Sequence, residues 1–139
     1  STATNASEPV FEGDWLDPGA HVTAMGQYHP RKRELDATTI ARAKYVPDLR
    51  GRLEQDAGAY IQAREAGAIE GDHVHAELGE VVAGVAPGRQ AADEITVFDS
   101  GGTAIETIAA GKLLYDRAVE QDLGTTLDFA PASEAFPGR

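Results

Sequence analysis

Short apolar runs and helical spacings divide the chain into strands and helices. Three short apolar runs predict strands at 21–26, 45–49 and 95–98. Apolar positions three and four residues apart predict helices at 37–43, 51–66, 75–82 and 103–121. A strand, a glycine turn and a helix follow one another from 95 to 121, an order that favours an α/β fold.

Local signals sharpen several of these boundaries. Asp36 is expected to cap the helix at 37–43, and Gly67 to end the helix at 51–66. Pro47 has no amide hydrogen to donate, so its strand should lie at a sheet edge or end early.

The length of 139 residues predicts one domain. Residues 1–8 carry no capping or strand signal, so the chain is expected to start inside a domain, and the domain proper is expected to end at residue 123. Residues 124–139 should form a tail that needs a partner surface to be ordered, with one further strand near 125–129 as an option.

Charge and cysteine content exclude several classes of function. The 23 Asp and Glu outnumber the 12 Lys and Arg, which gives a formal net charge of -11. Such a surface repels phosphate backbones, so nucleic acid is not an expected partner. Either an ordinary acidic protein or a salt-adapted, halophilic one would have this charge. The absence of cysteine excludes disulfide scaffolds, zinc ribbons and thiolate catalysis.

Targeting signals are not expected either. No run approaches the ~18–20 apolar residues of a membrane-spanning helix. The first residues lack the basic and apolar regions of a signal peptide. A cytoplasmic protein with no membrane partner is therefore predicted.

The segment 95–104 carries the strongest chemical signal. It places Asp99, Ser100, Gly101 and Gly102 at the carboxyl end of a strand and before a helix, where free amides gather and where α/β sheets bind ligands. Asp99 or Ser100 could hydrogen-bond a carboxamide or hydroxyl group, and the glycines let a flat ring approach the backbone. The alternative interpretation is a plain turn capped by a hydroxyl side chain.

A second strand end could face the same crevice. The strand at 21–26 ends in small residues and leads into a loop with the hydrogen-bonding side chains of Gln27, Tyr28 and His29. The alternative is a buried strand followed by a solvent loop, with His29 an ordinary surface histidine.

Other patterns have plainer explanations. His73 and His75 with Glu77 and Glu80 have metal-like spacing, but glutamates are also favoured at a helix N-terminus, so no metal is expected. The basic cluster at 31–33 lies beside Glu34 and Asp36 and is interpreted as a solvated face, with a phosphate site as the alternative. The sequence contains no Gly-x-Gly-x-x-Gly, P-loop lysine or Gly-x-Ser-x-Gly motif.

Four segments together resemble the ornithine cyclodeaminase/mu-crystallin family over nearly all of residues 2–124. They are Thr2-Ala-Thr-Asn-Ala-Ser-Glu-Pro, the segment from Trp15 through Ala24-Met-Gly26 and Pro30 to Arg33-Glu-Leu-Asp36, His75-Ala-Glu-Leu-Gly-Glu-Val-Val-Ala-Gly84, and Ile95-Thr-Val-Phe-Asp-Ser-Gly-Gly-x-Ala104. Members of this family are NAD(P)-dependent and include ornithine cyclodeaminases, archaeal alanine dehydrogenases and ketimine reductases.

The resemblance implies a larger parent protein. Family members are more than twice this length, with an N-terminal substrate and dimerisation domain followed by a Rossmann-type domain. This chain resembles the later strands and helices of the Rossmann-type domain, without its first βαβ unit. The tail would pack on the missing substrate domain, and a homodimer is implied for the full-length protein.

The family pattern also implies site residues, by position. Those implied to line NAD or NADP are Thr2, Thr4, Ala24, Met25, Gly26 and Ser100. Gly101 and Gly102 would lie where substrate and nicotinamide meet. Tyr28 stands two residues before Pro30, where ornithine cyclodeaminases have a catalytic aspartate, and is the candidate catalytic residue.

The tyrosine changes the expected reaction. Cyclisation of ornithine needs a carboxylate to handle protons, and a phenol is a poor base at neutral pH. We therefore expect part of an enzyme that transfers hydride between nicotinamide and a small amino acid/imino acid pair, of the alanine dehydrogenase or imine reductase type. Ornithine cyclodeaminase is the first alternative. A non-catalytic binder of NADPH and a small ligand, or an inert fragment, is the second.

Overall fold

The computed structural model describes residues 1–127 of the chain. The chain divides into two compact units, residues 1–103 and residues 104–139, and each is described by itself. The first unit holds a parallel sheet with helices beside it, which confirms the predicted α/β class.

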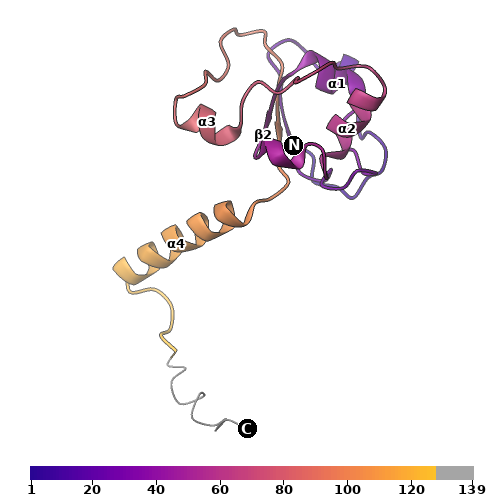
Figure 1. The fold of residues 1–139 in the computed structure, drawn as a ribbon. Helices are drawn as coiled ribbons and strands as arrows, with labels where there is room; N and C mark the ends of the chain where they lie inside the picture. Colours follow the sequence, from indigo (N-terminus) through magenta and orange to yellow (C-terminus); the bar gives the residue numbers. More distant parts are fainter. Residues whose placement is uncertain (128–139) are drawn as a thin grey trace, which may run out of the picture. The chain divides into compact units, whose positions relative to one another are not determined.

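The sheet of the first unit has its last strand in the middle (Figure 1). Its strands are β1 (His21–Ala24), β2 (Lys44–Pro47) and β3 (Thr96–Asp99), in the order β1-β3-β2 and all parallel. Ala24 and Pro47 both stand in register with Asp99, so the three carboxyl ends lie in one row. As the proline predicts, β2 lies at one side of this sheet and ends at Pro47.

One short helix precedes the first strand of this unit, and four lie between its strands. They are η1 (Gly13–Trp15), α1 (Ala37–Arg42), η2 (Arg50–Arg52), α2 (Gly58–Glu65) and α3 (Leu78–Val82). The Asp36 carboxylate accepts a hydrogen bond from the Thr39 amide at 2.7 Å, which confirms the predicted cap of α1.

The core lies between one face of the sheet and helices α1 and α2. Alternate strand residues such as Val22, Tyr45 and Val97 are buried on this face. The rings of Tyr45 and Tyr60 pack with centroids 5.2 Å apart, which joins β2 to α2. Ile40 adds the contribution of α1 to the same cluster.

Two predicted helices begin later than the sequence pattern indicates. The prediction of 51–66 is wrong at its start, because residues 50–57 form η2 and turns, and Ala57 instead pairs with Tyr28 in an antiparallel bridge. The prediction of 75–82 also starts too early, because the His75 amide donates to the Tyr45 carbonyl at 2.9 Å and holds this segment extended beside β2.

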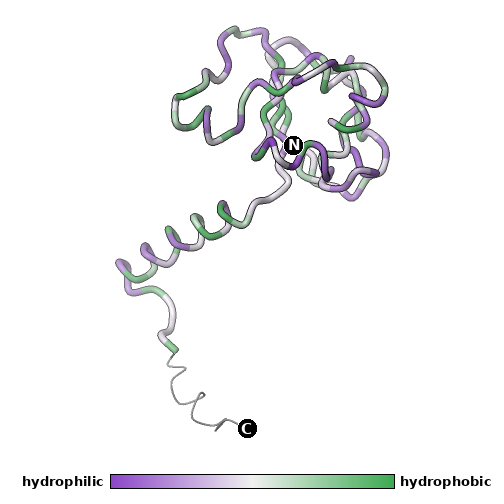
Figure 2. Tube along the Cα trace, viewed as in Figure 1, coloured by the Kyte–Doolittle hydropathy of each residue, from purple (hydrophilic) through white to green (hydrophobic). Residues whose placement is uncertain are grey.

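Helix α4 (Ala104–Glu120) belongs to the second unit and confirms the prediction at 103–121. Figure 2 shows hydrophobic positions recurring along it. Its large apolar side chains are exposed, namely Ile105, Ile108, Leu113, Leu114, Tyr115 and Val119. Lys112 pairs with Asp116 at 2.5 Å, one helical turn away.

The predicted tail at 124–139 is only partly described. Residues 124–127 form no strand, and residues 128–139 lie outside the described part of the chain. Within residues 1–127, no helix combines the length and the apolar character needed to cross a bilayer.

Gly58 should be intolerant of a side chain. A Cβ at this position would overlap the carbonyl oxygens of Lys32 and His29 at the start of α2. Gly58→Ala is therefore expected to lower the free energy of unfolding by about 1–3 kcal/mol, measured by urea denaturation. Gly51→Ala is the matched control, because no atom would lie within 4 Å of its Cβ. Equal stabilities of the two variants would contradict this packing.

Candidate functional site

The candidate site is the carboxyl edge of the sheet, where three strands lead into loops. β1 continues into Met25 and Gly26, β2 into Asp48, and β3 into the turn Ser100–Gly102. The Ser100 amide donates to the Ala24 carbonyl at 2.9 Å, so the exits of β1 and β3 are held side by side. The loops from separate parts of the chain therefore form one surface.

A buried carboxylate, Glu34, organises the β1 side of this edge. It accepts hydrogen bonds from the Gly26 amide at 2.7 Å, the Met25 amide at 3.1 Å, the Thr2 hydroxyl at 2.8 Å and the Thr4 amide. The backbone of Thr2 also pairs with β1, through bonds of 2.8 Å to Thr23 and 3.0 Å from Met25. Residues 2–4 and 25–26 are thus tied to one side chain.

The ionisation of Glu34 follows from these donors. Burial raises the pKa of its carboxyl, but the hydrogen bonds from the Thr4 and Gly26 amides and the Thr2 hydroxyl outweigh burial and lower the pKa below 4.5. The group is therefore ionised at neutral pH. Gly26 must be glycine at this place, because a Cβ would overlap the Thr4 carbonyl oxygen and the Glu34 carboxylate.

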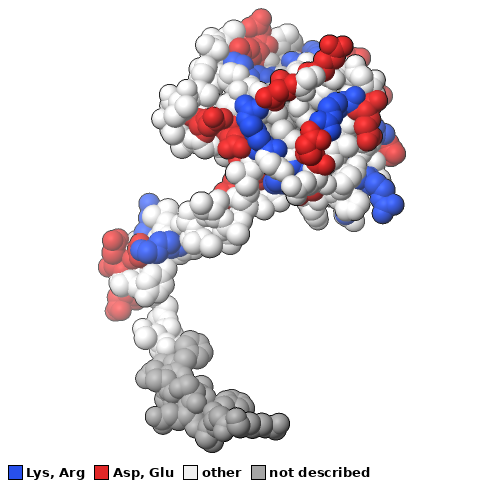
Figure 3. Space-filling view, in the orientation of Figure 1, with Lys and Arg blue, Asp and Glu red and all other residues white. Residues whose placement is uncertain are grey.

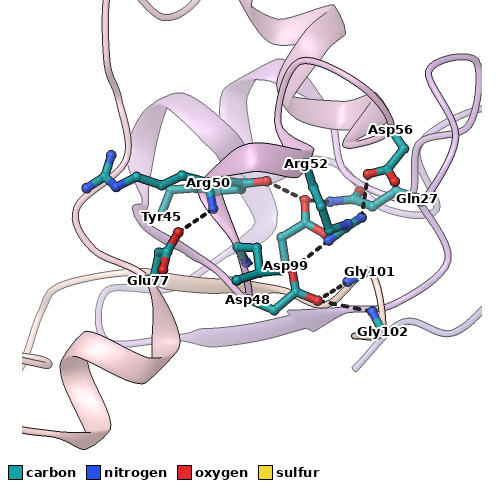
Figure 4. Close-up of polar contacts among 11 residues, drawn as sticks. Gln27, Tyr45, Asp48, Arg50, Arg52, Asp56, Glu77, Asp99, Gly101 and Gly102 are labelled. Atoms are coloured by element: carbon teal, nitrogen blue, oxygen red, sulfur yellow. Dashed lines mark hydrogen bonds and ion pairs between the residues drawn. The ribbon is translucent and has the colours of Figure 1, made fainter. Parts of the chain in front are cut away.

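A second carboxylate, Asp48, holds the turn after β3 (Figure 4). One of its oxygens accepts from the Gly101 amide at 2.8 Å and the Gly102 amide at 3.0 Å. Its other oxygen pairs with Arg52 at 2.7 Å, and Arg52 reaches Asp56 at 2.8 Å. The prediction that these amides are free for a ligand is therefore wrong, since an internal carboxylate already occupies them.

Asp99 lies buried beneath the same turn. One of its oxygens accepts from the side-chain nitrogen of Gln27 at 2.9 Å and from the Tyr45 hydroxyl. The other, Oδ1, has no hydrogen-bond partner among the described residues. Desolvation by burial raises the pKa of Asp99 to about 6, against the opposing effect of these two donors. Asp99 is 1% exposed, so the prediction that it could bond a ligand directly is wrong.

Burial and the neighbouring Asp99 also raise the pKa of Tyr45 well above its ordinary value. The hydroxyl therefore stays protonated and donates. Gln27 links the backbone of Glu34 to the Asp99 carboxylate, because its side-chain oxygen accepts from the Glu34 backbone amide at 3.3 Å while its side-chain nitrogen donates to Asp99. The two sides of the edge are connected through buried polar groups.

The predicted site residues gather at this edge with different exposures. Ala24 and Gly26 are buried, whereas Met25 is 50% exposed. Ser100 is half-buried, and Gly102 has a φ of 75°, a conformation that favours glycine. Thr2, Thr4 and Met25 all donate to Glu34, so the structure brings together residues that the family pattern implies line the cofactor.

Tyr28, the candidate catalytic residue, lies on the loop after Gln27. Its side chain is 52% exposed, and its ring centroid lies 5.6 Å from the Lys32 ammonium nitrogen. Its backbone pairs with Ala57 ahead of α2. The loop around Tyr28 is thus anchored, while the phenol remains accessible.

The histidines and the basic cluster have local partners. The rings of His73 and His75 contact the carbonyl oxygens of Ile40 at 2.8 Å and Pro87 at 2.7 Å. Within residues 1–127, no group of three His, Asp or Glu side chains could hold a metal ion. In the basic cluster, Arg33 pairs with Glu8.

Glu34, Asp48 and Arg52 are site-building residues that the sequence patterns did not predict. Glu34 directly follows the basic cluster that is interpreted from the sequence as a solvated face, yet its own side chain is buried. The usable signal was its place inside the family-like segment that ends at Asp36. Asp48 lies one residue past Pro47, and its partners at 101–102 carry no local sign of the contact.

Comparison with known proteins agrees with this architecture. The model of the "Ornithine cyclodeaminase/mu-crystallin family" matches residues 1–122, and the chain belongs to that family. It is 38% identical over 130 residues to the alanine dehydrogenase of Archaeoglobus fulgidus, covering 92% of this chain and 39% of that protein.

Solved structures agree in fold. The Δ1-pyrroline-2-carboxylate reductase of Thermococcus litoralis, in complex with NADH and L-proline, superposes with a TM-score of 0.80 at 40% identity, covering 89% of this chain and 38% of that one. An archaeal alanine dehydrogenase dimer with bound NAD gives a TM-score of 0.76 at 35% identity, covering 91% and 39%. The fold is thus that of part of a Rossmann-type dehydrogenase domain, and the chain spans about two fifths of these relatives.

Replacing the Glu34 carboxylate should loosen the β1 side of the edge. Glu34→Gln would turn the NH₂ group of a side-chain amide toward backbone donors, and we expect a loss of about 2–3 kcal/mol in the free energy of unfolding at pH 7, measured by urea denaturation. Amide hydrogen exchange at Thr4 and Gly26 should accelerate in parallel. The wild-type contribution is present above pH 4.5 and is lost as the pH falls through the lowered pKa.

The control for this variant is Glu54→Gln, since Glu54 is exposed and pairs only with Arg64 on the surface. It should leave stability and both exchange rates nearly unchanged. A Glu34→Gln protein as stable as the wild type would contradict the role of Glu34.

The contribution of Asp99 to stability should depend on pH in the opposite sense to that of Glu34. Because its folded pKa of about 6 exceeds the ordinary 3.8, its contribution to stability falls as pH rises through this window and stays lower above it. Asp99→Asn keeps an oxygen that accepts from Tyr45 and Gln27, and it removes the loss of stability with rising pH because the amide does not ionise. The variant should therefore gain up to about 3 kcal/mol relative to wild type between pH 4 and pH 8.

Urea denaturation at the two pH values measures this gain. Asp93→Asn, at an exposed carboxylate, is the control and should show the wild-type slope. If the free energies of unfolding of Asp99→Asn and wild type differ by the same amount at pH 4 and pH 8, Asp99 does not titrate in this range and the account of its burial is contradicted.

Proposed function

We propose that the protein is an NAD(P)-dependent oxidoreductase that transfers hydride between the nicotinamide and a small amino acid/imino acid pair, of the alanine dehydrogenase or imine reductase type. The observation that carries the proposal is the edge itself, where Met25–Gly26 and Ser100–Gly102 leave neighbouring parallel strands. α/β sheets bind ligands at such an edge. The named relatives bind NAD or NADH, and one binds L-proline.

The residues present fit one end of a dinucleotide. Half-exposed Met25 offers an apolar surface for a flat ring, and Thr4 and Ser100 carry hydroxyl groups on segments that backbone hydrogen bonds to Glu34 and Ala24 hold at the same edge. The sequence has no Gly-x-Gly-x-x-Gly loop for a pyrophosphate. We therefore assign only the nicotinamide end to this chain, and leave NAD and NADP as alternatives.

When bound, the cofactor would supply the hydride chemistry. The residues of this chain would orient it. Glu34 would keep residues 2–4 and 25–26 in place as one wall, and the turn Ser100–Gly102 would form the other. Gly101 and Gly102 would border the substrate through their carbonyls and their lack of side chains, because Asp48 occupies their amides.

Tyr28 distinguishes the main proposal from ornithine cyclodeamination. Its exposed phenol could donate a hydrogen bond to a substrate at this edge. A cyclodeaminase needs a carboxylate there to accept protons, and this chain has none at position 28. We therefore keep cyclodeaminase activity as the alternative, and a non-catalytic binder of NADPH as the second.

Assembly and environment are part of the same proposal. We propose a homodimer for the full-length protein, supported by the dimeric archaeal alanine dehydrogenase. We also propose a cytoplasmic, salt-adapted protein, supported by the absence of cysteine and the net charge of -11. Figure 3 shows acidic and basic side chains interspersed on the visible face of residues 1–103. Surface ion pairs such as Arg50 with Asp72 at 2.8 Å form within this unit. Residues 124–139 are proposed to pack on a substrate domain.

Assays of the full-length gene product test the proposal. NADH or NADPH should be oxidised in the presence of pyruvate with ammonia, or of a cyclic imino acid such as Δ1-pyrroline-2-carboxylate, and followed by absorbance. With ornithine as the substrate, no release of ammonia should be detected. Conversion of ornithine to proline would favour the cyclodeaminase, and tight cofactor binding without turnover of any pair would favour the binding protein.

A further inference from the structure

Arg52 lies directly against the turn that borders the proposed substrate position. Figure 4 shows its guanidinium among Asp48, Asp56 and the Gly101–Gly102 turn. One nitrogen pairs with Asp48 at 2.7 Å, and the other reaches Asp56 at 2.8 Å. The side chains of Arg52 and Asp48 are only 13% and 1% exposed, so this pairing is shielded from water and its geometry is well defined.

The guanidinium also occupies the space beside Gly101. A Cβ at this position would overlap Arg52, and the three atoms it would meet first all belong to that guanidinium. Gly101 differs in this from Gly102, whose φ of 75° by itself favours glycine. A side chain at position 101 would thus have to displace the Arg52 guanidinium.

Asp48 connects Arg52 to the turn. Its buried carboxylate accepts from both turn amides, and it needs a cation on its other oxygen because an unpaired buried charge is strongly unfavourable. Loss of Arg52 would leave that charge uncompensated and release the turn. A lysine has one nitrogen and could pair with Asp48 or Asp56, but could not lie flat against Gly101.

We propose that Arg52 is a positioning residue: through Asp48 and by direct contact with Gly101, it fixes the Gly101–Gly102 turn at the distance from the nicotinamide that the substrate requires. The inference rests on the proposed function for its catalytic consequence. The contacts among Arg52, Asp48 and the turn are observed in the structure and do not depend on that function. Arg52 itself touches neither cofactor nor substrate.

A double-mutant cycle on the full-length protein tests this role. Gly101→Ala and Arg52→Ala should each lower kcat/KM for the amino or imino acid by about 10- to 100-fold, because small displacements at a reacting site are costly. The double variant should be no worse than Arg52→Ala, since removing the guanidinium makes room for the new methyl group. Losses that multiply in the double variant would overturn the proposal.

Three further readouts separate positioning from general destabilisation. The dissociation constant for NADH should change less than twofold in Arg52→Ala, and guanidinium ion at millimolar concentration should restore part of kcat. Arg52→Lys should remain impaired although it keeps the charge. Arg64→Ala, at an exposed pair with Glu54, is the matched control and should behave as wild type. Unchanged kinetics in Arg52→Ala or full activity in Arg52→Lys would contradict the role of Arg52.

Amide hydrogen exchange at Gly101 and Gly102 tests the structural role of Arg52 without requiring turnover of a substrate. Exchange should accelerate in Arg52→Ala and Arg52→Lys, but not in Arg64→Ala. If the wild type turns over no substrate pair while exchange still responds in this way, the proposed function fails and the structural link from Arg52 to the turn holds. If exchange does not respond, the positioning role fails whatever the activity.

Discussion

The carboxyl edge of the sheet depends on one buried carboxylate. Glu34 accepts hydrogen bonds from the amides of Thr4, Met25 and Gly26, and the Met25 amide also donates to the Thr2 carbonyl at 3.0 Å. Placing a charge in the interior is costly, but several converging donors keep it ionised and make the geometry specific. The exit of β1 and the segment at residues 2–4 therefore form one rigid surface.

Two more buried acids support the β3 side in different ways. Asp48 is charged and compensated by Arg52, so it can hold two backbone amides. Asp99 has neutral donors, and burial raises its pKa to about 6, so it weakens the fold as it ionises. An unfavourable buried group below a binding edge is typical of functional sites. The acids of this edge thus build the walls of the proposed site, while Met25, Tyr28 and Ser100 are the residues proposed to meet ligands.

Much of the fold was predictable because the signals were local. The strand at 95–98, the cap at Asp36 and helix α4 depend on neighbouring residues, and all three are observed. The start of α2 was not predictable, because the bridge between Ala57 and Tyr28 joins distant segments. The same holds for the site: its edge followed from the glycine turn after β3, but Asp48 acts on an amide 53 residues away.

The central claim is that the walls held by Glu34 and Asp48 enclose the nicotinamide and its substrate. A crystal structure of the full-length protein with NADH and an amino acid tests it most directly. We expect the nicotinamide ring against Met25 and Ser100, the substrate beside the Gly101–Gly102 turn, and both turn amides still bound to Asp48. A nicotinamide bound away from this edge, or turn amides transferred from Asp48 to the ligand, would contradict the account.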